Sequence, residues 1–190
     1  MNEKPADTKS SILSIARNLM RQLGYNAFSY ADIARKLDIK NAAIHYHYPA
    51  KADLLADVME TYISEYQQLG KQLAAANLDP CQKLQQYIAK YSVLTSQDSI
   101  CIIGSVASDY NTLPESVKAK VAQLINLVIG MVEKTLQEGK EEGVFRFPEP
   151  PRVRALLIMT NLAAGVQLAR ISGKADFVAI EKAIVDQLIK

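Results

Sequence analysis

The fold is decided by residues 29–51, which read SYADIARKLDIKNAAIHYHYPAK. Ser29 is a typical helix N-cap, and Asp32 follows three residues later, where its carboxylate can return to the cap. Apolar residues recur at helical spacing before Asp38 and again from Ile39, until Tyr48-Pro49 stops the pattern. This pattern predicts two short helices joined by a tight turn at Asp38.

The second of these helices has an unusual surface. Around its buried positions it carries small, hydrogen-bonding or cationic side chains and no carboxylate, namely Lys40, Asn41, Ala42, His45, Tyr46 and His47. A short helix with small residues near its start can enter a DNA major groove, where polar groups reach phosphates and base edges. The alternative for such a pattern alone is an ordinary helical hairpin in a core.

The surrounding sequence favours the first interpretation. Residues 12–55 read ILSIARNLMRQLGYNAFSYADIARKLDIKNAAIHYHYPAKADLL. This segment resembles the DNA-binding region of TetR/AcrR-family transcriptional regulators. The resemblance is carried by motifs at fixed spacing, namely Gly24-Tyr25, Ser29 with Asp32-Ile33-Ala34, Tyr46-His47-Tyr48 and Lys51.

The resemblance implies an all-α protein with a three-helix DNA-binding domain, residues 1–51, joined by a long helix to a helical effector-binding and dimerisation domain, residues 52–190. It implies a sequence-specific regulator, most simply a dimeric repressor that a small molecule releases from a near-palindromic double-stranded operator. The residues expected to face the groove are Lys40, Asn41, Ala42, Ala43, His45, Tyr46 and His47. Those expected to hold phosphates are Ser29, Tyr30, Tyr46, His47 and Lys51.

The sequence departs from the family pattern at four places. Asp38 stands where the turn usually has Gly, and a left-handed conformation costs Asp less than most residues but more than Gly. Ala42-Ala43 replaces the usual Gly-Thr, and His45 replaces Tyr. Ala50 replaces the Ser that caps the long helix. Contacts and operator sequence therefore do not transfer from relatives.

Composition agrees with a helical regulator. The 190 residues are 49% hydrophobic and 22% charged, which suits a packed core rather than a disordered chain. Residues 1–51 hold eight Lys or Arg against four Asp or Glu, whereas the remainder holds fourteen against sixteen. The basic part coincides with the expected DNA-binding region. With no signal-like apolar start and no uninterrupted apolar run of membrane-spanning length, we expect a cytoplasmic protein without membrane contact.

Beyond residue 51 the pattern predicts a long helix to about residue 76, further helices near 80–95, 100–110, 114–139 and 151–171, and a last helix capped by Asp176. The resemblance implies that the last two helices form a homodimer. Its expected interface comprises Leu156, Ala163, Ala164, Gly165, Leu168, Phe177, Ile180 and Ile184. The alternative is that this face packs within one subunit.

The expected effector site lies between the long helix and the later helices. Tyrosines offer stacking area plus a hydroxyl, which suits a small apolar or aromatic effector. The expected lining is Tyr62, Tyr66, Tyr87, Tyr91, Cys101, Tyr110, Leu124 and Val128. Each of these residues taken singly also fits a core position. Cys101 is either a buried structural thiol or a reactive sensor, and no His or Arg adjoins it in sequence to lower its pKa.

Enzymatic readings have little support. The two histidines, His45 and His47, are two residues apart on a helix and point in different directions. No catalytic or metal-ligand constellation, phosphate loop or nucleophile elbow is present, so we expect no enzyme, metal or cofactor. The competing class is a helical ligand-binding or scaffold protein that has lost specific DNA binding.

Overall fold

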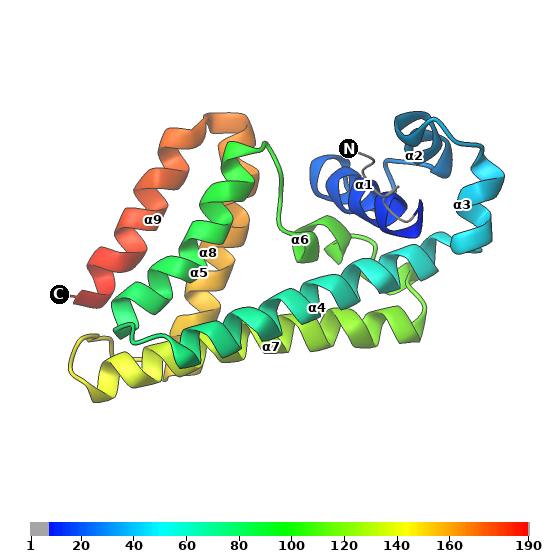
Figure 1. Cartoon of the computed structure of the whole chain (residues 1–190). Coiled ribbons are helices and arrows are strands. Elements are labelled where there is room, and N and C mark those ends of the chain that lie inside the picture. The colour runs from blue at the N-terminus through cyan, green and yellow to red at the C-terminus, as the bar shows by residue number, and fades with distance from the viewer. Residues whose placement is uncertain (1–7, 190) are drawn as a thin grey trace, which may run out of the picture. The chain divides into compact units, whose positions relative to one another are not determined.

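The computed structural model describes residues 8–189, which are helical along most of their length (Figure 1). No strand occurs within that range, and the predicted all-α class is confirmed. In chain order the elements are α1 (Thr8–Leu23), α2 (Tyr30–Leu37), α3 (Asn41–His47), α4 (Lys51–Ala75), α5 (Pro80–Ser96), α6 (Ile102–Ala107), the 3-10 helix η1 (Tyr110–Thr112), α7 (Glu115–Glu141), α8 (Pro151–Ser172) and α9 (Lys174–Ile189).

The chain forms two compact units, described separately here. Unit 1 comprises Met1–Ile63 and Ile102–Gln123, and unit 2 comprises Ser64–Cys101 and Leu124–Lys190. Both α4 and α7 are continuous helices that contribute one part to each unit.

In unit 1, α1 packs against α2, α3 and α6. Ile12, Ala16 and Met20 of α1 are fully buried, because they recur on one face at helical spacing. After α1, Tyr25 donates its backbone N–H to the Ser105 carbonyl of α6 (3.3 Å), which connects the two segments of this unit.

The predicted turn and cap of the helical pair are present. Both the backbone N–H and the hydroxyl of Ser29 donate to the Asp32 carboxylate at 2.8 Å. Asp38 ends α2 in the left-handed conformation, with φ 54° and ψ 45°. Its N–H donates to the Ala34 carbonyl, so an aspartate makes the turn that glycine usually makes.

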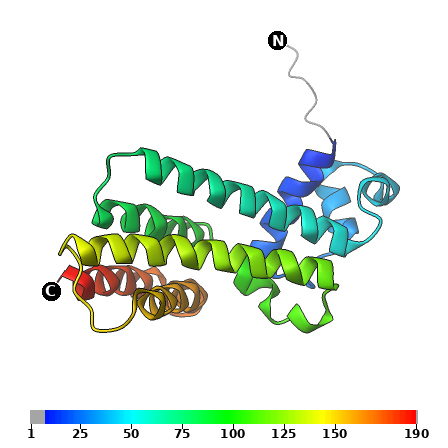
Figure 2. The ribbon, with the colours of Figure 1, turned by 90° about the horizontal axis from the view of Figure 1, so that it is seen from below.

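In unit 2, α8 and α9 lie side by side and α5 packs against both (Figures 1 and 2). The α8–α9 contact is close at Gly165, where an added Cβ would lie 3.1 Å from the Phe177 ring and 3.2 Å from Ile180. Phe177 and Ile184 are buried here within the single chain, at 1% and 6% exposure. They therefore pack α9 on its own subunit.

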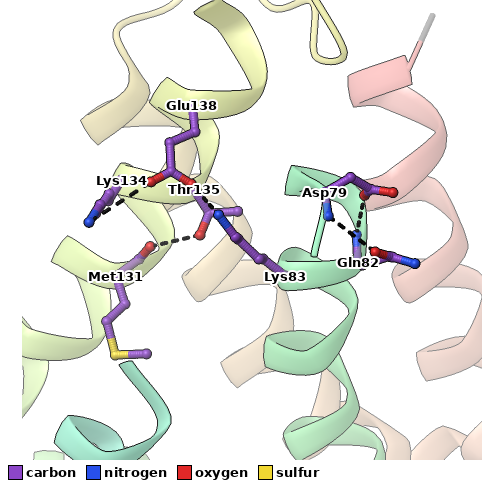
Figure 3. Close-up of polar contacts among 7 residues, drawn as sticks. All are labelled: Asp79, Gln82, Lys83, Met131, Lys134, Thr135 and Glu138. Carbon is purple, nitrogen blue, oxygen red and sulfur yellow. Dashed lines mark hydrogen bonds and ion pairs between the residues drawn. The ribbon is translucent and has the colours of Figure 1, made fainter. Parts of the chain in front are cut away.

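A polar cluster joins α5 to α7 in unit 2 (Figure 3). The Lys83 ammonium lies 2.8 Å from the Glu138 carboxylate, and both side chains are largely buried, which limits competition by water. Lys134 approaches the same carboxylate at 3.9 Å. The start of α5 is fixed by a reciprocal cap in which Asp79 accepts from the Gln82 N–H and the Gln82 amide oxygen accepts from the Asp79 N–H.

The end of α7 requires a glycine. A Cβ at Gly139 would lie only 2.1 Å from the Phe145 ring, which folds back onto the helix. The Phe145 N–H donates to the Gly139 carbonyl at 2.8 Å, and the Arg146 N–H donates to the Leu188 carbonyl of α9. This connection therefore joins α7 to the end of the chain.

Two expected helices have different bounds. The last helix begins at Lys174, not after a cap at Asp176, because Gly173 alone, at φ 106°, makes the break after α8. Asp176 instead lies in the first turn, where a carboxylate favours the positive helix end. The expected helix over 100–110 is shorter and is followed by the 3-10 turn.

Helix α8 is long and apolar enough to cross a membrane by length and composition, contrary to the sequence-based expectation. In the structure it packs against α5 and α9 and buries a stripe of residues, Ala155, Ile158, Met159, Leu162, Gly165, Val166 and Ala169. The core helix of a soluble protein also meets this criterion, and the buried stripe gives α8 one such core face.

Candidate functional site

Helix α3 is anchored by one residue and exposes most of the others. Ile44 is fully buried, and Ala43 and His47 are half-buried. The exposed residues are Lys40, Asn41, Ala42, His45 and Tyr46, with Tyr46 at 83% exposure. The Tyr46 ring is therefore accessible to a partner. Five of the seven residues expected to face the groove are thus exposed, four on α3 and Lys40 directly before it.

Tyr30 braces this helix from α2. Its hydroxyl donates to the Tyr48 carbonyl at 2.9 Å, directly after α3. Its ring meets the His45 ring edge-on, with centroids 4.8 Å apart. Burial, with a smaller contribution from Asp53, raises the pKa of Tyr30 to about 12. The Tyr30 hydroxyl is therefore engaged within the chain and holds α3 in place.

Ser29 is engaged in the same way. Its backbone and side-chain hydrogen bonds to Asp32 lower the pKa of that carboxyl, and Arg35 adds an ion pair at 3.2 Å. The Ser29 hydroxyl proton is directed to Asp32, so the hydroxyl serves the cap of α2. The geometry favours a positioning role for Ser29 over the phosphate contact expected from the sequence.

Lys51, at the start of α4, is also directed inward. Its ammonium donates to the Phe28 backbone carbonyl and lies 4.0 Å from the centre of the Phe28 ring and 4.9 Å from that of Tyr25. Burial lowers the pKa of this lysine. In this position Lys51 ties α4 to the segment between α1 and α2, which again favours positioning over phosphate contact.

One half of a capping box is present at Ala50. The Ala50 backbone N–H donates to the Asp53 carboxylate at 3.0 Å, whereas alanine has no side-chain oxygen that could accept from the first turn in return.

Sequence reasoning missed a further brace centred on Asp57. Its carboxylate accepts from the Tyr48 hydroxyl at 3.1 Å and pairs with Lys9 at 2.9 Å. The ammonium of Lys9 also lies 5.3 Å from the Tyr48 ring centre. The sequence does contain a signal for this brace: the acidic residue Asp57 lies two turns into the long helix, and the aromatic residue Tyr48 lies shortly before that helix. Asp57 holds the end of α3 to α4 and α1.

The expected effector residues are divided between the two units. In unit 2, Tyr66 and Cys101 lie near enough to Tyr87 to influence its ionisation electrostatically. Leu124 and Val128 are buried in the same unit. Tyr62 and Tyr110 belong to unit 1, where Tyr62 stacks under the Arg17 guanidinium at 4.1 Å and Tyr110 is exposed.

The centre of the unit 2 group is the pair Tyr87 and Tyr91 on α5. Both are buried, at 3% and 4% exposure, and their ring centroids are 5.8 Å apart. The Tyr87 hydroxyl donates to the Met159 sulfur of α8. The Tyr91 hydroxyl lies 3.9 Å from the same sulfur and 3.5 Å from the Tyr87 oxygen. Burial is the main cause of the raised pKa of both phenols, so both remain protonated donors at neutral pH.

The expected dimer residues have mixed surroundings. Leu156, Ala164 and Leu168 are exposed on α8, and Ala163 and Ile180 are half-buried. Gly165, Phe177 and Ile184 are buried in the α8–α9 contact described above. The exposed apolar surface of these two helices also includes Val153, Leu157, Ile171, Val178 and Ile189.

The part of the chain that the structure describes contains no metal-binding cluster. Across residues 8–189, no group of three or more His, Cys, Asp or Glu side chains is arranged to hold a metal ion. Both cysteines are half-buried thiols, and burial raises the pKa of Cys81.

The comparisons agree with this arrangement. Residues 12–58 match the family model described as bacterial regulatory proteins, tetR family. Over these residues the chain therefore resembles the DNA-binding region of the tetR family. A TetR transcriptional regulator from Legionella pneumophila is 28% identical, with 99% of this chain and 100% of that chain aligned at a TM-score of 0.86. A TetR-family regulator from Agrobacterium tumefaciens is also 28% identical, over 98% and 100% of the two chains, at a TM-score of 0.90.

More distant TetR-like structures share the fold alone. One is the transcriptional regulator FadR from Bacillus subtilis in complex with stearoyl-CoA, which is 16% identical over 95% of this chain and 97% of that chain, with a TM-score of 0.70. No curated protein sequence matches the chain. The TetR family consists of transcriptional regulators, and this chain has their fold and their DNA-binding region.

Proposed function

We propose that the protein binds a specific operator through α3 and acts as a repressor that a small molecule releases. The observation that carries this proposal is a contrast within unit 1. The residues around α3 are engaged in internal hydrogen bonds, whereas α3 and its N-cap Lys40 expose Lys40, Asn41, His45 and Tyr46. A rigidly held helix with exposed donors suits readout of base edges.

In this proposal, Lys40 contacts phosphate, and Asn41 and His45 contact base edges. Ala42 and Ala43 permit close approach to the groove or contact a thymine methyl group. Tyr46 and His47, whose rings meet edge-on at 5.1 Å, lie at the end of α3 and approach the backbone. Lys36, exposed in the last turn of α2, is a further cation for phosphate contact.

Two copies of the chain are needed for a near-palindromic operator. The exposed apolar side chains of α8 and α9, chiefly Leu157, Leu168, Ile171 and Val178, support a self-complementary interface between these helices. Such residues in contact across a two-fold axis would be removed from water together, which gives the free energy for association.

The regulatory step that we propose passes along a continuous helix. α4 begins beside the DNA-binding segment and ends in unit 2, where the Tyr66, Tyr87 and Tyr91 group lies. An effector that binds one conformation of unit 2 more tightly shifts the population toward that conformation and changes the position of α3. The FadR structure, which has the same fold, was solved in complex with stearoyl-CoA and supports a small-molecule site in proteins of this fold.

The test is selection from random duplex DNA followed by fluorescence anisotropy of the enriched sequence at two salt concentrations, with nonspecific competitor present. A specific regulator binds with a Kd of about 10⁻⁸ M or tighter and resists competitor. Only weak binding that vanishes with salt would instead support the alternative, a helical ligand-binding protein that no longer reads sequence.

A further inference from the structure

The hydroxyls of Tyr87 and Tyr91 converge on an atom that is a poor acceptor. Both groups are buried in unit 2, where water does not compete. Tyr87 donates to the thioether sulfur of Met159, and Tyr91 lies 3.9 Å from the same sulfur. A thioether accepts hydrogen bonds only weakly. Neither hydroxyl therefore forms with Met159 a hydrogen bond as strong as an oxygen acceptor would give.

The two phenols do not satisfy one another either. Their oxygens are 3.5 Å apart, beyond the usual range of about 2.5–3.0 Å for O–H···O bonds. A buried donor that lacks a good acceptor lowers the stability of the fold. A ligand that places an oxygen between the two hydroxyls would recover this stability.

Met159 is suited to give way to such an oxygen. Its unbranched side chain has three rotatable bonds and adapts easily to a changed neighbour. It lies on α8, whereas both tyrosines lie on α5 one turn apart, so its movement leaves the two donors on one helix face. The sulfur thus marks the position of the missing acceptor.

The surroundings favour a neutral oxygen. Burial is the main cause that raises the pKa of both phenols, and the neighbouring groups that act on them among residues 8–189 are Tyr66, Cys101 and the two phenols themselves, with no cation among these groups. Lys90 is exposed, and its ammonium lies 5.7 Å from the Tyr66 ring centre. A buried carboxylate without a cationic partner is costly, whereas a ketone oxygen is not.

We propose that Tyr87 and Tyr91 form a paired hydrogen-bond donor for the neutral carbonyl oxygen of an apolar effector, with this oxygen taking the place of the Met159 sulfur. This inference rests on the proposed function as an effector-responsive regulator, and it specifies the chemical class of the effector. Its direct test is ligand binding to the full chain, which is independent of DNA.

The probes are two matched series. The first is acetophenone, isopropenylbenzene and benzoate, and the second is acetylnaphthalene, isopropenylnaphthalene and naphthoate. Within each series the shape is kept while the carbonyl is replaced by a hydrocarbon or a carboxylate. Isothermal titration calorimetry should show that a ketone binds about tenfold more tightly than its hydrocarbon and its carboxylate partners.

Tyr87→Phe and Tyr91→Phe should each remove most of this preference while leaving hydrocarbon binding unchanged, because the rings remain. Ser96→Ala, which removes an exposed hydroxyl from the same helix α5, is the control and should keep the preference. Met159→Leu removes the competing sulfur at similar volume and should not weaken ketone binding. Thermal unfolding of each variant establishes that it is folded.

Three results would overturn the proposal: equal affinity for hydrocarbon or carboxylate, a preference that survives both Tyr→Phe variants, or no binding of any probe. Anisotropy with the selected operator, measured on the same protein sample, separates these results from failure of the proposed function. A chain that binds its operator but ignores every ketone loses the carbonyl proposal alone.

Discussion

Lys51 donates a hydrogen bond to the backbone carbonyl of Phe28, and its ammonium lies 4.0 Å from the centre of the Phe28 ring. This contact joins the first residue of α4 to the segment before α2. A residue whose place in the sequence suggests a phosphate contact therefore has a structural task inside unit 1.

Replacing Lys51 with methionine should destabilise the DNA-binding segment. The change keeps most of the aliphatic stem but removes the donor and the cation–π contacts, so we expect the free energy of unfolding to fall by about 1 kcal/mol. Urea denaturation measures this. At a temperature where the variant is folded, its salt dependence of DNA binding should match the unchanged protein. A slope lower by about one phosphate contact would show that Lys51 binds DNA directly.

Lys40 and Asn41 should separate backbone contact from base readout. Lys40→Ala should weaken binding to every duplex and lower the salt slope by about one, because it removes one phosphate contact. Asn41→Ala should cost about 1–3 kcal/mol at one base position and relax the preference there. Anisotropy with single-base operator variants measures both. Uniform weakening by Asn41→Ala, or a loss confined to one base for Lys40→Ala, would reverse the assignment.

Asp38 allows a backbone test at φ 54° and ψ 45°. Asp38→Ala should lower the free energy of unfolding by about 1 kcal/mol, since a left-handed conformation costs Ala more than Asp. Asp38→Asn should be nearly neutral, and Asp38→Gly at least as stable as either. Chemical denaturation ranks the three. If the Ala and Gly variants have the same free energy of unfolding, the left-handed conformation at residue 38 does not contribute to stability.

Tyr30 should make the free energy of unfolding fall at alkaline pH. The folded chain holds its phenol neutral up to about pH 12, whereas in the unfolded chain the pKa returns to its ordinary value of 10.0. Its contribution is therefore fully present below pH 10.0 and is lost as pH rises through about 12. Tyr30→Phe should cost about 1 kcal/mol at neutral pH, by losing the bond to Tyr48, and should reduce the alkaline loss. Urea unfolding across this range, with the exposed Tyr46→Phe as control, measures it; an unchanged alkaline loss would contradict the assignment.

The proposed dimer face is tested by charge. Leu168→Glu and Ile171→Glu replace residues of α8 that are 55% and 88% exposed, so the single chain should keep its fold. The double variant should sediment as a monomer and bind the operator at least tenfold more weakly, because the two α3 helices of a dimer are then no longer linked. Val93→Glu, exposed on α5 at 51%, is the matched control and should stay dimeric. A double variant with unchanged sedimentation would place the interface elsewhere.

Several features could be predicted from residues 29–51 because they depend on neighbours close in sequence. The Ser29–Asp32 cap, the turn at Asp38 and the helical pair require only residues three or four apart, and all are present. The exposed side of α3 follows from the same periodicity, since burying Ile44 directs its neighbours outward.

The tertiary structure alone decided which residues that are far apart in the sequence contact one another. The Lys51 bond to Phe28 spans 23 residues, and the Tyr87 contact with Met159 spans 72. Helical periodicity states which side of a helix is apolar but not which helix covers it, so it could not tell that Phe177 and Ile184 pack on their own subunit. The sequence by itself therefore determined the helices and the exposed side of α3. Tertiary packing decided which polar groups are used internally, because a donor's role depends on the acceptor that folding places beside it.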